Sequence, residues 1–408
     1  MVAIRALPFL LLFPGYFAYH WSAINRWTPL YIGGYVNEVS SLILFGMIFA
    51  VSARALFMNR IRFSWCFVDS AFFIFMLWFL AIVVIHAINL TSPEVTKNHI
   101  ASLIQLAGAY IALRIFPYPG AKWLLLACAA VFSLMVLQSA EQDLLGLLFQ
   151  SYQGAGYTTY QGLARSYLIT AAFGLIFVKF FVARWVGYAL VTFVLFLLGA
   201  RSEIAGAVIM FSIFEIAMSR KPRQALLVTA LIIGILGLLL FSLIDWLEYL
   251  YPDNRLLTLL LRQEADGSLQ ERAIQHALAW DAILAKPILG DYGHYAKELS
   301  AGAYAHSWIS AWVDLGIMGL LLFLLLYVAL FRIGLALYQA SIDSKHTVMR
   351  RYCSVGLGLL LMTVTFSIFA KTFTDTSIAM VAGLLAGIHL NLTRHASQAA
   401  LRTVRNET

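Results

Sequence analysis

Charged residues are scarce in this sequence. Only 12% of the 408 residues are Asp, Glu, Lys or Arg, whereas 62% are hydrophobic. A typical soluble domain has about 25% charged residues, and a surface with much less charge promotes association and precipitation. The composition therefore excludes an ordinary soluble protein and indicates a chain that is solvated by lipid.

Cysteines and metal-binding motifs are rare as well. The three cysteines, Cys66, Cys128 and Cys353, lie in or beside apolar segments and form no CxxC pair. We interpret them as apolar packing residues rather than as a disulfide or a metal site. The sequence also lacks a Walker loop, an HExxH motif and paired outer carboxylates for a divalent ion. These absences predict a protein that uses no metal and no cofactor.

Long apolar segments are abundant instead. Segments of about 20 residues recur along the whole chain, which is the length that a helix needs to cross a bilayer. The sequence therefore predicts an all-α polytopic membrane protein with about twelve transmembrane helices. We expect these helices at residues 5–20, 38–58, 66–89, 98–116, 121–140, 163–182, 184–200, 203–219, 224–245, 306–336, 348–370 and 375–394.

The basic residues predict the orientation of these helices. Lys and Arg gather on alternate short loops, so the net charge of +8 is interpreted as a topology signal and not as a nucleic-acid site. Both termini are expected in the cytoplasm of a bacterium, with the protein in the inner membrane. The predicted divisions are transmembrane helices one to nine in 1–245, a periplasmic loop in 246–305, helices ten to twelve in 306–394 and a cytoplasmic tail in 395–408.

The loop 246–305 is the largest segment outside the predicted spans, and it has helical signals of its own. Ser268 and Glu271 form a capping box, which predicts a helix that runs to about Ala285. A helix with one apolar face would lie on the membrane surface or cover a cavity. The apolar residues that share a face here are those at positions 269, 273, 277, 280 and 284.

A second outer loop, residues 141–162, is rich in Tyr and Gln. Tyr157 and Tyr160 are the candidates in it for contacts with sugar hydroxyl groups. Tyr is also the ordinary residue of a membrane interface, so this loop has a structural interpretation too.

His306 is the first candidate for chemistry. It lies where a polar loop gives way to a long apolar run, at the outer start of the tenth predicted span. The positive end of that helix dipole would disfavour a protonated ring, and a neutral imidazole is what a general base needs. The alternative is an interfacial histidine that is hydrogen-bonded to a backbone group.

Arg201 and Arg272 are candidate anion ligands. Arg201 separates two apolar runs at the outer surface, where an ionisable group is costly and often marks a site. The structural alternative is an arginine that snorkels and pairs with Glu203.

Arg272 stands in the first turn of the predicted loop helix, where a cation is disfavoured unless an anion is shared. The structural alternative is a solvated residue that pairs with Glu271 or Asp266. Guanidinium groups match phosphate oxygens in pairs of hydrogen bonds.

Three further charged residues lie near the predicted outer turns. Lys371 and Asp375 flank the turn between spans eleven and twelve, and Arg165 begins span six. They could be exposed charges that contribute little to stability, or they could line the same cavity as His306.

Three motifs stand out around these candidates. They are Gly199-Ala200-Arg201-Ser202, then Ser268-x-x-x-Arg272 with Trp280 and Pro287-Ile288-Leu289-Gly290, and then Ala305-His306-Ser307 with Leu315-Gly316-Ile317-x-Gly319-Leu320. These motifs resemble those of the O-antigen ligase and O-antigen polymerase superfamily. One difference is Asp291-Tyr292-Gly293, where relatives often have Gly-x-Gly directly.

The resemblance implies a GT-C-like glycosyltransferase. The donor would be O-antigen polysaccharide on undecaprenyl pyrophosphate, and the acceptor would be lipid A–core oligosaccharide. Arg201 and Arg272 would neutralise the pyrophosphate without metal. His306 would take the proton of the acceptor hydroxyl as it attacks the anomeric carbon. Without a carboxylate nucleophile, this displacement would invert the configuration.

Other activities compete with the ligase. A polymerase of the same superfamily would pass the glycan to another lipid-linked repeat unit, and ligase is preferred on overall length and loop placement. Protein O-glycosyltransferases commonly carry a further C-terminal region, which is not expected here. A lipid flippase or transporter is the rival from another class; transporters often have charges near the bilayer midplane, whereas the informative charges here gather at one face.

Overall fold

The computed structural model describes residues 2–25, 27, 46, 49–50, 53, 65–115, 121–141, 160–252, 254–261, 267–299, 304–342, 347–370 and 372–407. In this part of the chain all regular secondary structure is helical, which confirms the all-α prediction. The N-terminal half contains α1 (Val2–Leu10), η1 (Leu11–Gly15), α2 (Tyr16–Ile24), α4 (Phe67–Ile88), α5 (Pro93–Ile115), α6 (Lys122–Glu141), α8 (Tyr160–Leu175) and α9 (Phe181–Leu197). The remainder contains α10 (Arg201–Met218), α11 (Pro222–Ser242), α12 (Ile244–Leu250), α13 (Arg255–Leu261), α14 (Gly267–Ala285), α15 (His294–Glu298), α16 (Ile309–Ile342), α17 (Thr347–Phe369) and α18 (Thr376–Glu407).

Several of these helices are suited to a membrane. Every predicted span except 38–58, most of which lies outside the described residues, contains a helix. The number twelve and the periplasmic assignment of 246–305 stay predictions. Five helices in the described part are long and apolar enough to cross a bilayer: Phe67–Ile88, Lys122–Ala140, Pro222–Ser242, Ile309–Ala340 and Val348–Phe369. Two further apolar helices are shorter, Phe181–Leu197 and Thr376–Leu392.

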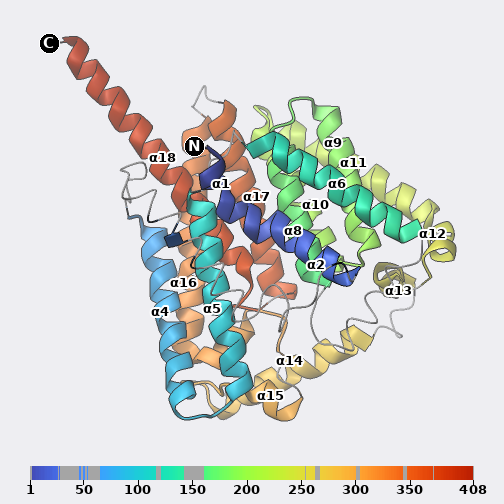
Figure 1. The fold of residues 1–408 in the computed structure, drawn as a ribbon, viewed down its shortest axis with the longest axis vertical. Helices are drawn as coiled ribbons and strands as arrows, with labels where there is room; N and C mark the ends of the chain where they lie inside the picture. Colours follow the sequence, from blue (N-terminus) through green and yellow to red (C-terminus); the bar gives the residue numbers. More distant parts are fainter. Residues whose placement is uncertain are drawn as a thin grey trace.

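Helices from both halves of the chain pack into one bundle. α5 lies along α18, α10 along α17, and α4 along α16. Buried aromatic rings fill the space between them: Phe75 of α4, for example, contacts Phe323 of α16 and Phe373 of the turn before α18. The C-terminal helices are thus the centre against which the N-terminal helices pack (Figure 1).

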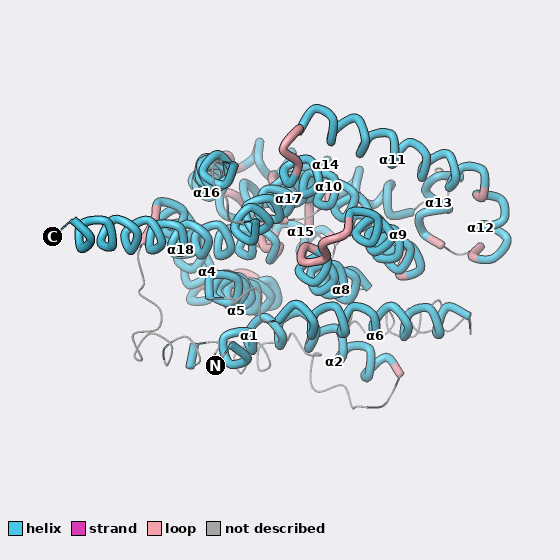
Figure 2. Tube along the Cα trace, turned by 90° about the horizontal axis from the view of Figure 1, so that it is seen from above, coloured by secondary structure: helices cyan, strands magenta, loops and turns pink. Residues whose placement is uncertain are grey.

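α11 shows the opposite pattern. Figure 2 shows α11 at the periphery of the bundle. Only 6% of its apolar 18-residue stretch is buried within the protein. Leu227, Leu231 and Leu238 are among its exposed side chains. An apolar surface of this extent is not stable in water, so it is expected where hydrocarbon chains are the solvent.

The segment between α11 and α16 is helical, as its sequence predicts, although α14 begins at Gly267 and Ser268 therefore lies inside the helix rather than at its N-cap. It forms α12 to α15, and Figure 1 shows α14 and α15 at the end of the bundle opposite to both chain termini. Termini on one side and the loop on the other agree with the predicted topology. Which side is the cytoplasm stays a prediction.

α14 has two apolar faces, whereas the sequence pattern indicated one. The predicted face is directed outward, with Trp280 40% and Leu284 76% exposed. The face that packs inward is made by Ala279, Ala282 and Ile283. The two alanines are small and allow α14 to approach its neighbours closely. The inward face contacts Tyr295, Ala305, Ile309 and Val313. The outward face therefore fits a membrane surface, while the inward face covers the start of α16.

Candidate active site

His306 lies in the short segment between Tyr304 and the start of α16. Its Nδ1 is 3.0 Å from the main-chain carbonyl oxygen of Ala370. A carbonyl oxygen can only accept, so Nδ1 must carry the proton and donate it. In the neutral ring the lone pair is then on Nε2. The bond to Ala370 therefore holds the imidazole in a tautomer that can accept a proton.

The dipole argument made from the sequence stays a prediction, and the structure adds a second helix end to it. It considered only the positive end of α16. Ala370 directly follows α17, so the ring is bonded to the carboxyl end of a different helix, which has partial negative charge. That end stabilises an imidazolium once Nε2 has taken up a proton. His306 is therefore hydrogen-bonded to a backbone group, as the structural alternative predicted. This bond is compatible with a role of the ring as a general base.

Further contacts attach the His306 segment to the turn between α17 and α18. The main-chain N–H of Trp308 donates to the carbonyl of Ser367 at 2.6 Å, and that of Phe373 donates to the hydroxyl of Ser310 at 3.3 Å. On the other side of His306, the ring of Tyr304 lies 4.6 Å from the imidazole, centroid to centroid. The ring is therefore held by the backbone of two segments that are remote in sequence.

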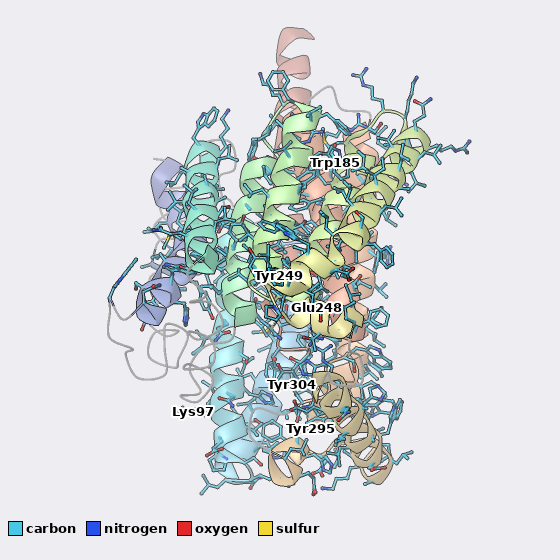
Figure 3. The ribbon with its side chains drawn as sticks, turned by 90° about the vertical axis from the view of Figure 1, so that its right-hand side faces the viewer. Lys97, Trp185, Glu248, Tyr249, Tyr295 and Tyr304 are labelled. Carbon is cyan, nitrogen blue, oxygen red and sulfur yellow. The ribbon has the colours of Figure 1, made fainter. Side chains whose placement is uncertain are left out.

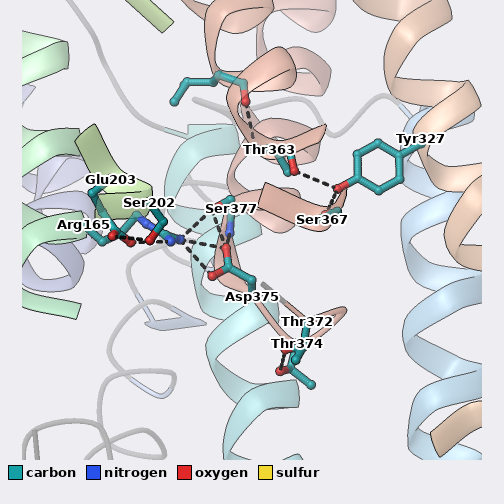
Figure 4. A network of polar contacts seen from close by, with 11 residues as sticks. Arg165, Ser202, Glu203, Tyr327, Thr363, Ser367, Thr372, Thr374, Asp375 and Ser377 are labelled. Atoms are coloured by element: carbon teal, nitrogen blue, oxygen red, sulfur yellow. Dashed lines mark hydrogen bonds and ion pairs between the residues drawn. The ribbon is translucent and has the colours of Figure 1, made fainter. Parts of the chain in front are cut away.

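Arg165 and Asp375 form a buried ion-pair network with Glu203 (Figure 4). Arg165 donates to Asp375 at 2.7 and 3.0 Å, to Glu203 at 3.0 Å and to the hydroxyl of Ser377 at 2.6 Å. Glu203 also accepts from Ser202 at 2.7 Å. Two carboxylates thus share one guanidinium. The interpretation of Asp375 as half of an exposed pair is corrected, because its carboxylate pairs with Arg165 and its side chain is only 18% exposed.

Arg201 is close in sequence to this network, but its approach to the turn that holds His306 stays a prediction. Arg201 begins α10, two residues before Glu203, and it is partly buried. Glu203 is joined to Asp375 through Arg165, and Asp375 lies in the same turn as Ala370. The Glu203 carboxylate pairs with Arg165 at 3.0 Å, and the snorkelling interpretation of Arg201 stays open.

The other candidates are less closely connected. Arg272 stands in the second turn of α14 rather than the first, because the helix begins at Gly267, and it is partly exposed. α14 packs on α16 and on α15, so Arg272 belongs to the layer that covers the His306 segment. That it meets Arg201 and His306 in one cleft stays a prediction. Lys371, Tyr157 and the side chain of Tyr160 lie outside the described residues.

The glycines of two motifs allow the backbone at 288–290 to pack directly on the backbone at 313–317, a contact that we call the joint. Gly290 has φ +74° and Gly316 has φ +71°, which L side chains rarely adopt. A Cβ on Gly290 would lie 2.5 Å from the carbonyl oxygen of Val313. The N–H of Ile317 donates to the carbonyl of Ile288 at 3.1 Å across this joint. The Pro287–Gly290 motif thus docks on the kink of α16.

The turn after Gly290 forms although Asp291-Tyr292 separates the glycines. The Asp291 N–H donates to Val313 at 2.7 Å, and its carboxylate contacts Lys286 at 2.9 Å and His294 at 3.0 Å. Burial would raise the pKa of Asp291, but the hydrogen bonds from Lys286 and His294 and the charge of Lys297 outweigh it and lower this pKa to about 2. Asp291 therefore stays ionised and closes the turn at any physiological pH.

Sequence reasoning missed two parts of this arrangement. The Ala370 carbonyl has no sequence signal, since every residue has one. The pairing of Glu203 with Arg165 joins positions 38 residues apart, which no local pattern reveals. In the part of the chain that the structure describes, no group of three or more His, Cys, Asp or Glu side chains could hold a metal ion.

Comparison with known families agrees with the three motifs. The family model described as O-antigen ligase matches residues 186–324, a segment that includes Arg201, Arg272 and His306. No curated protein gives a significant match to the chain. The matched segment runs from α9 into α16 and thus contains the joint and the His306 segment. The match covers about a third of the chain, and residues 186–324 are therefore similar to the O-antigen ligase family.

Proposed function

We propose that the protein transfers O-antigen polysaccharide from undecaprenyl pyrophosphate to lipid A–core oligosaccharide at the periplasmic face of the bacterial inner membrane. The observation that carries the proposal is the hydrogen bond from His306 Nδ1 to the Ala370 carbonyl, 3.0 Å long, which leaves the basic nitrogen of the neutral ring at Nε2. The O-antigen ligase match over residues 186–324 supplies the substrate class, lipid-linked glycan in a membrane.

The chemistry is a single displacement. Nε2 of His306 takes the proton of an acceptor hydroxyl while that oxygen attacks the anomeric carbon of the donor. The bond from that carbon to the pyrophosphate oxygen breaks as the new glycosidic bond forms, and undecaprenyl pyrophosphate leaves with the electron pair. Arg201 and Arg272 stabilise the charge on the leaving group. One displacement inverts the anomeric configuration.

Substitution of Arg201 tests the role of the guanidinium. We expect Arg201→Ala to lower the transfer rate by about 100-fold to 1,000-fold, the usual effect of removing one donor to developing charge. Arg201→Lys should recover only part of the rate, because an ammonium cannot form the paired hydrogen bonds. The rate is measured with purified lipids, and Arg223→Ala, an exposed arginine of α11, is the matched control. Wild-type transfer by Arg201→Ala would exclude the pyrophosphate role.

Chelation tests the source of the positive charge. If guanidinium groups neutralise the pyrophosphate, transfer in a reconstituted system should continue at an unchanged rate in excess EDTA. Loss of transfer that Mg²⁺ restores would contradict the proposal, since it would show that a divalent ion does this work.

The material that accumulates in a His306→Ala strain separates the competing functions. A ligase defect leaves completed lipid-linked polymer and uncapped lipopolysaccharide. A polymerase defect leaves single lipid-linked repeat units, and a flippase defect leaves them on the cytoplasmic leaflet. The family match is compatible with ligase and polymerase alike, so reconstitution with purified lipid-linked polysaccharide and rough lipopolysaccharide is the direct test.

A further inference from the structure

A cavity of about 170 Å³ lies beside the His306 segment. Its wall comes from α5, from the turn and short helix at 293–296, from the start of α16 and from the α17–α18 turn. Tyr304 lines it, and the same ring lies 4.6 Å from the imidazole of His306. Figure 3 shows Tyr295 and Tyr304, two of its aromatic residues, at the same end of the molecule as Lys97 of α5. The cavity is therefore adjacent to the proposed base.

Two buried ionisable side chains face this cavity, and the mechanism above uses neither. Asp314 is 6% and His99 is 9% exposed. A carboxylate can accept about four hydrogen bonds, and among the described residues Asp314 accepts one, from the Gly293 N–H at 3.2 Å. His99 is oriented by Tyr292, whose hydroxyl lies 3.1 Å from its Nδ1. A buried carboxylate with spare acceptor capacity requires donors, and a ligand in the cavity would supply them.

The remaining lining specifies the class of ligand. The lining combines hydroxyl and amide groups with aromatic residues, a mixture that suits the hydroxyls and the apolar face of a sugar. The cavity of about 170 Å³ has room for about one pyranose ring. No Lys or Arg is found among the described lining residues, so nothing there would neutralise an acidic sugar. The polar groups are those of Asn98, Ser102, Thr372 and Thr374.

We propose that this cavity is a subsite for one uncharged pyranose residue, which Asp314 and His99 bind through its hydroxyls and Tyr304 contacts through its ring. The proposal rests on the proposed function, because only a glycan substrate would bring a sugar to this place. The sugar belongs either to the donor or to the acceptor, since both present pyranose rings next to the reacting atoms. The subsite would set which sugar is accepted, whereas His306 would set the rate.

Filling the cavity is the first test. Ala296 lines it and is partly buried, so Ala296→Met should occupy the space of the sugar. We expect KM for one substrate to rise at least tenfold while kcat stays within about threefold of wild type. A rise for rough lipopolysaccharide assigns the subsite to the acceptor, and a rise for lipid-linked polysaccharide assigns it to the donor. Ala277→Met, the same change on the exposed face of α14, is the control. An unchanged KM for both substrates overturns the proposal.

Direct binding separates this proposal from the proposed function. Saturation-transfer NMR on the full-length protein in detergent, with methyl α-glucopyranoside, should give a signal that Ala296→Met abolishes and that His306→Ala retains. Methyl α-glucuronide should bind at least tenfold more weakly, and Asp314→Asn should reduce that difference. Binding without any transfer would refute the function and leave the subsite intact. Equal binding of both glycosides, or a signal that Ala296→Met does not change, overturns the subsite.

Discussion

His306→Ala is expected to lower glycan transfer by about 100-fold to 10,000-fold, the contribution of a positioned general base. The structure supplies the reason, because the Ala370 carbonyl fixes the proton on Nδ1 and the lone pair on Nε2. The measurement is transfer of purified lipid-linked polysaccharide to rough lipopolysaccharide by the variant in proteoliposomes.

Two comparison variants separate the base from a structural role. His306→Asn places an amide N–H near the position of Nδ1, so it can still donate to Ala370, but it offers no basic nitrogen. We expect it to be as inactive as alanine and to unfold near the wild-type temperature. His276→Ala removes an exposed histidine of α14 and should leave transfer unchanged. Activity of His306→Asn within tenfold of wild type would show that the ring acts only through its hydrogen bond.

Arg165→Ala is expected to destabilise the fold by about 3–5 kcal/mol, the cost of removing one partner from a buried ion pair. Glu203 has a side chain that is 0% exposed and Asp375 one that is 18% exposed, so both carboxylates would lose their shared cation within the protein. The guanidinium also lies 4.7 Å from the ring centre of Phe366, a contact that alanine removes. Thermal unfolding in detergent, followed by size-exclusion chromatography, measures the effect.

Neutralising the carboxylates should reverse much of this loss. Arg165→Met combined with Glu203→Gln and Asp375→Asn removes the uncompensated charge and is expected to unfold at a higher temperature than Arg165→Ala. Arg223→Ala, on the exposed part of α11, is the control and should unfold as wild type does. If Arg165→Ala alone unfolds at the wild-type temperature, then the network does not stabilise the α17–α18 turn.

Local patterns were sufficient for the elements and for the first candidates. The apolar segments predict the helices, and the capping box at Ser268 predicts α14, since both depend on residues close in sequence. His306 and Arg201 stand out because a polar residue at the border of an apolar segment is costly. The three motifs that carry the family resemblance all lie within the segment that the family match covers.

Contacts between distant segments could not be predicted in this way. The pairing of Arg165 with Asp375 joins α8 to the turn before α18, and the donation from His306 goes to a main-chain atom. Asp314 and His99 were not among the sequence candidates, although both lie within predicted spans. An ionisable residue inside a span is a candidate site on principle, so this signal was available in the sequence.

The acceptor that fixes His306 belongs to the main chain of Ala370. A substitution at position 370 changes the side chain but keeps that oxygen. The tautomer of the His306 ring should therefore not change with a point substitution at this position. Its vulnerability lies in the path of the backbone: a change that rotates the peptide group after α17, such as an insertion or deletion between residues 366 and 375, would release the imidazole to its other tautomer. Sequence drift at position 370 is thus tolerable in side-chain identity, whereas a change in the length of this turn is not.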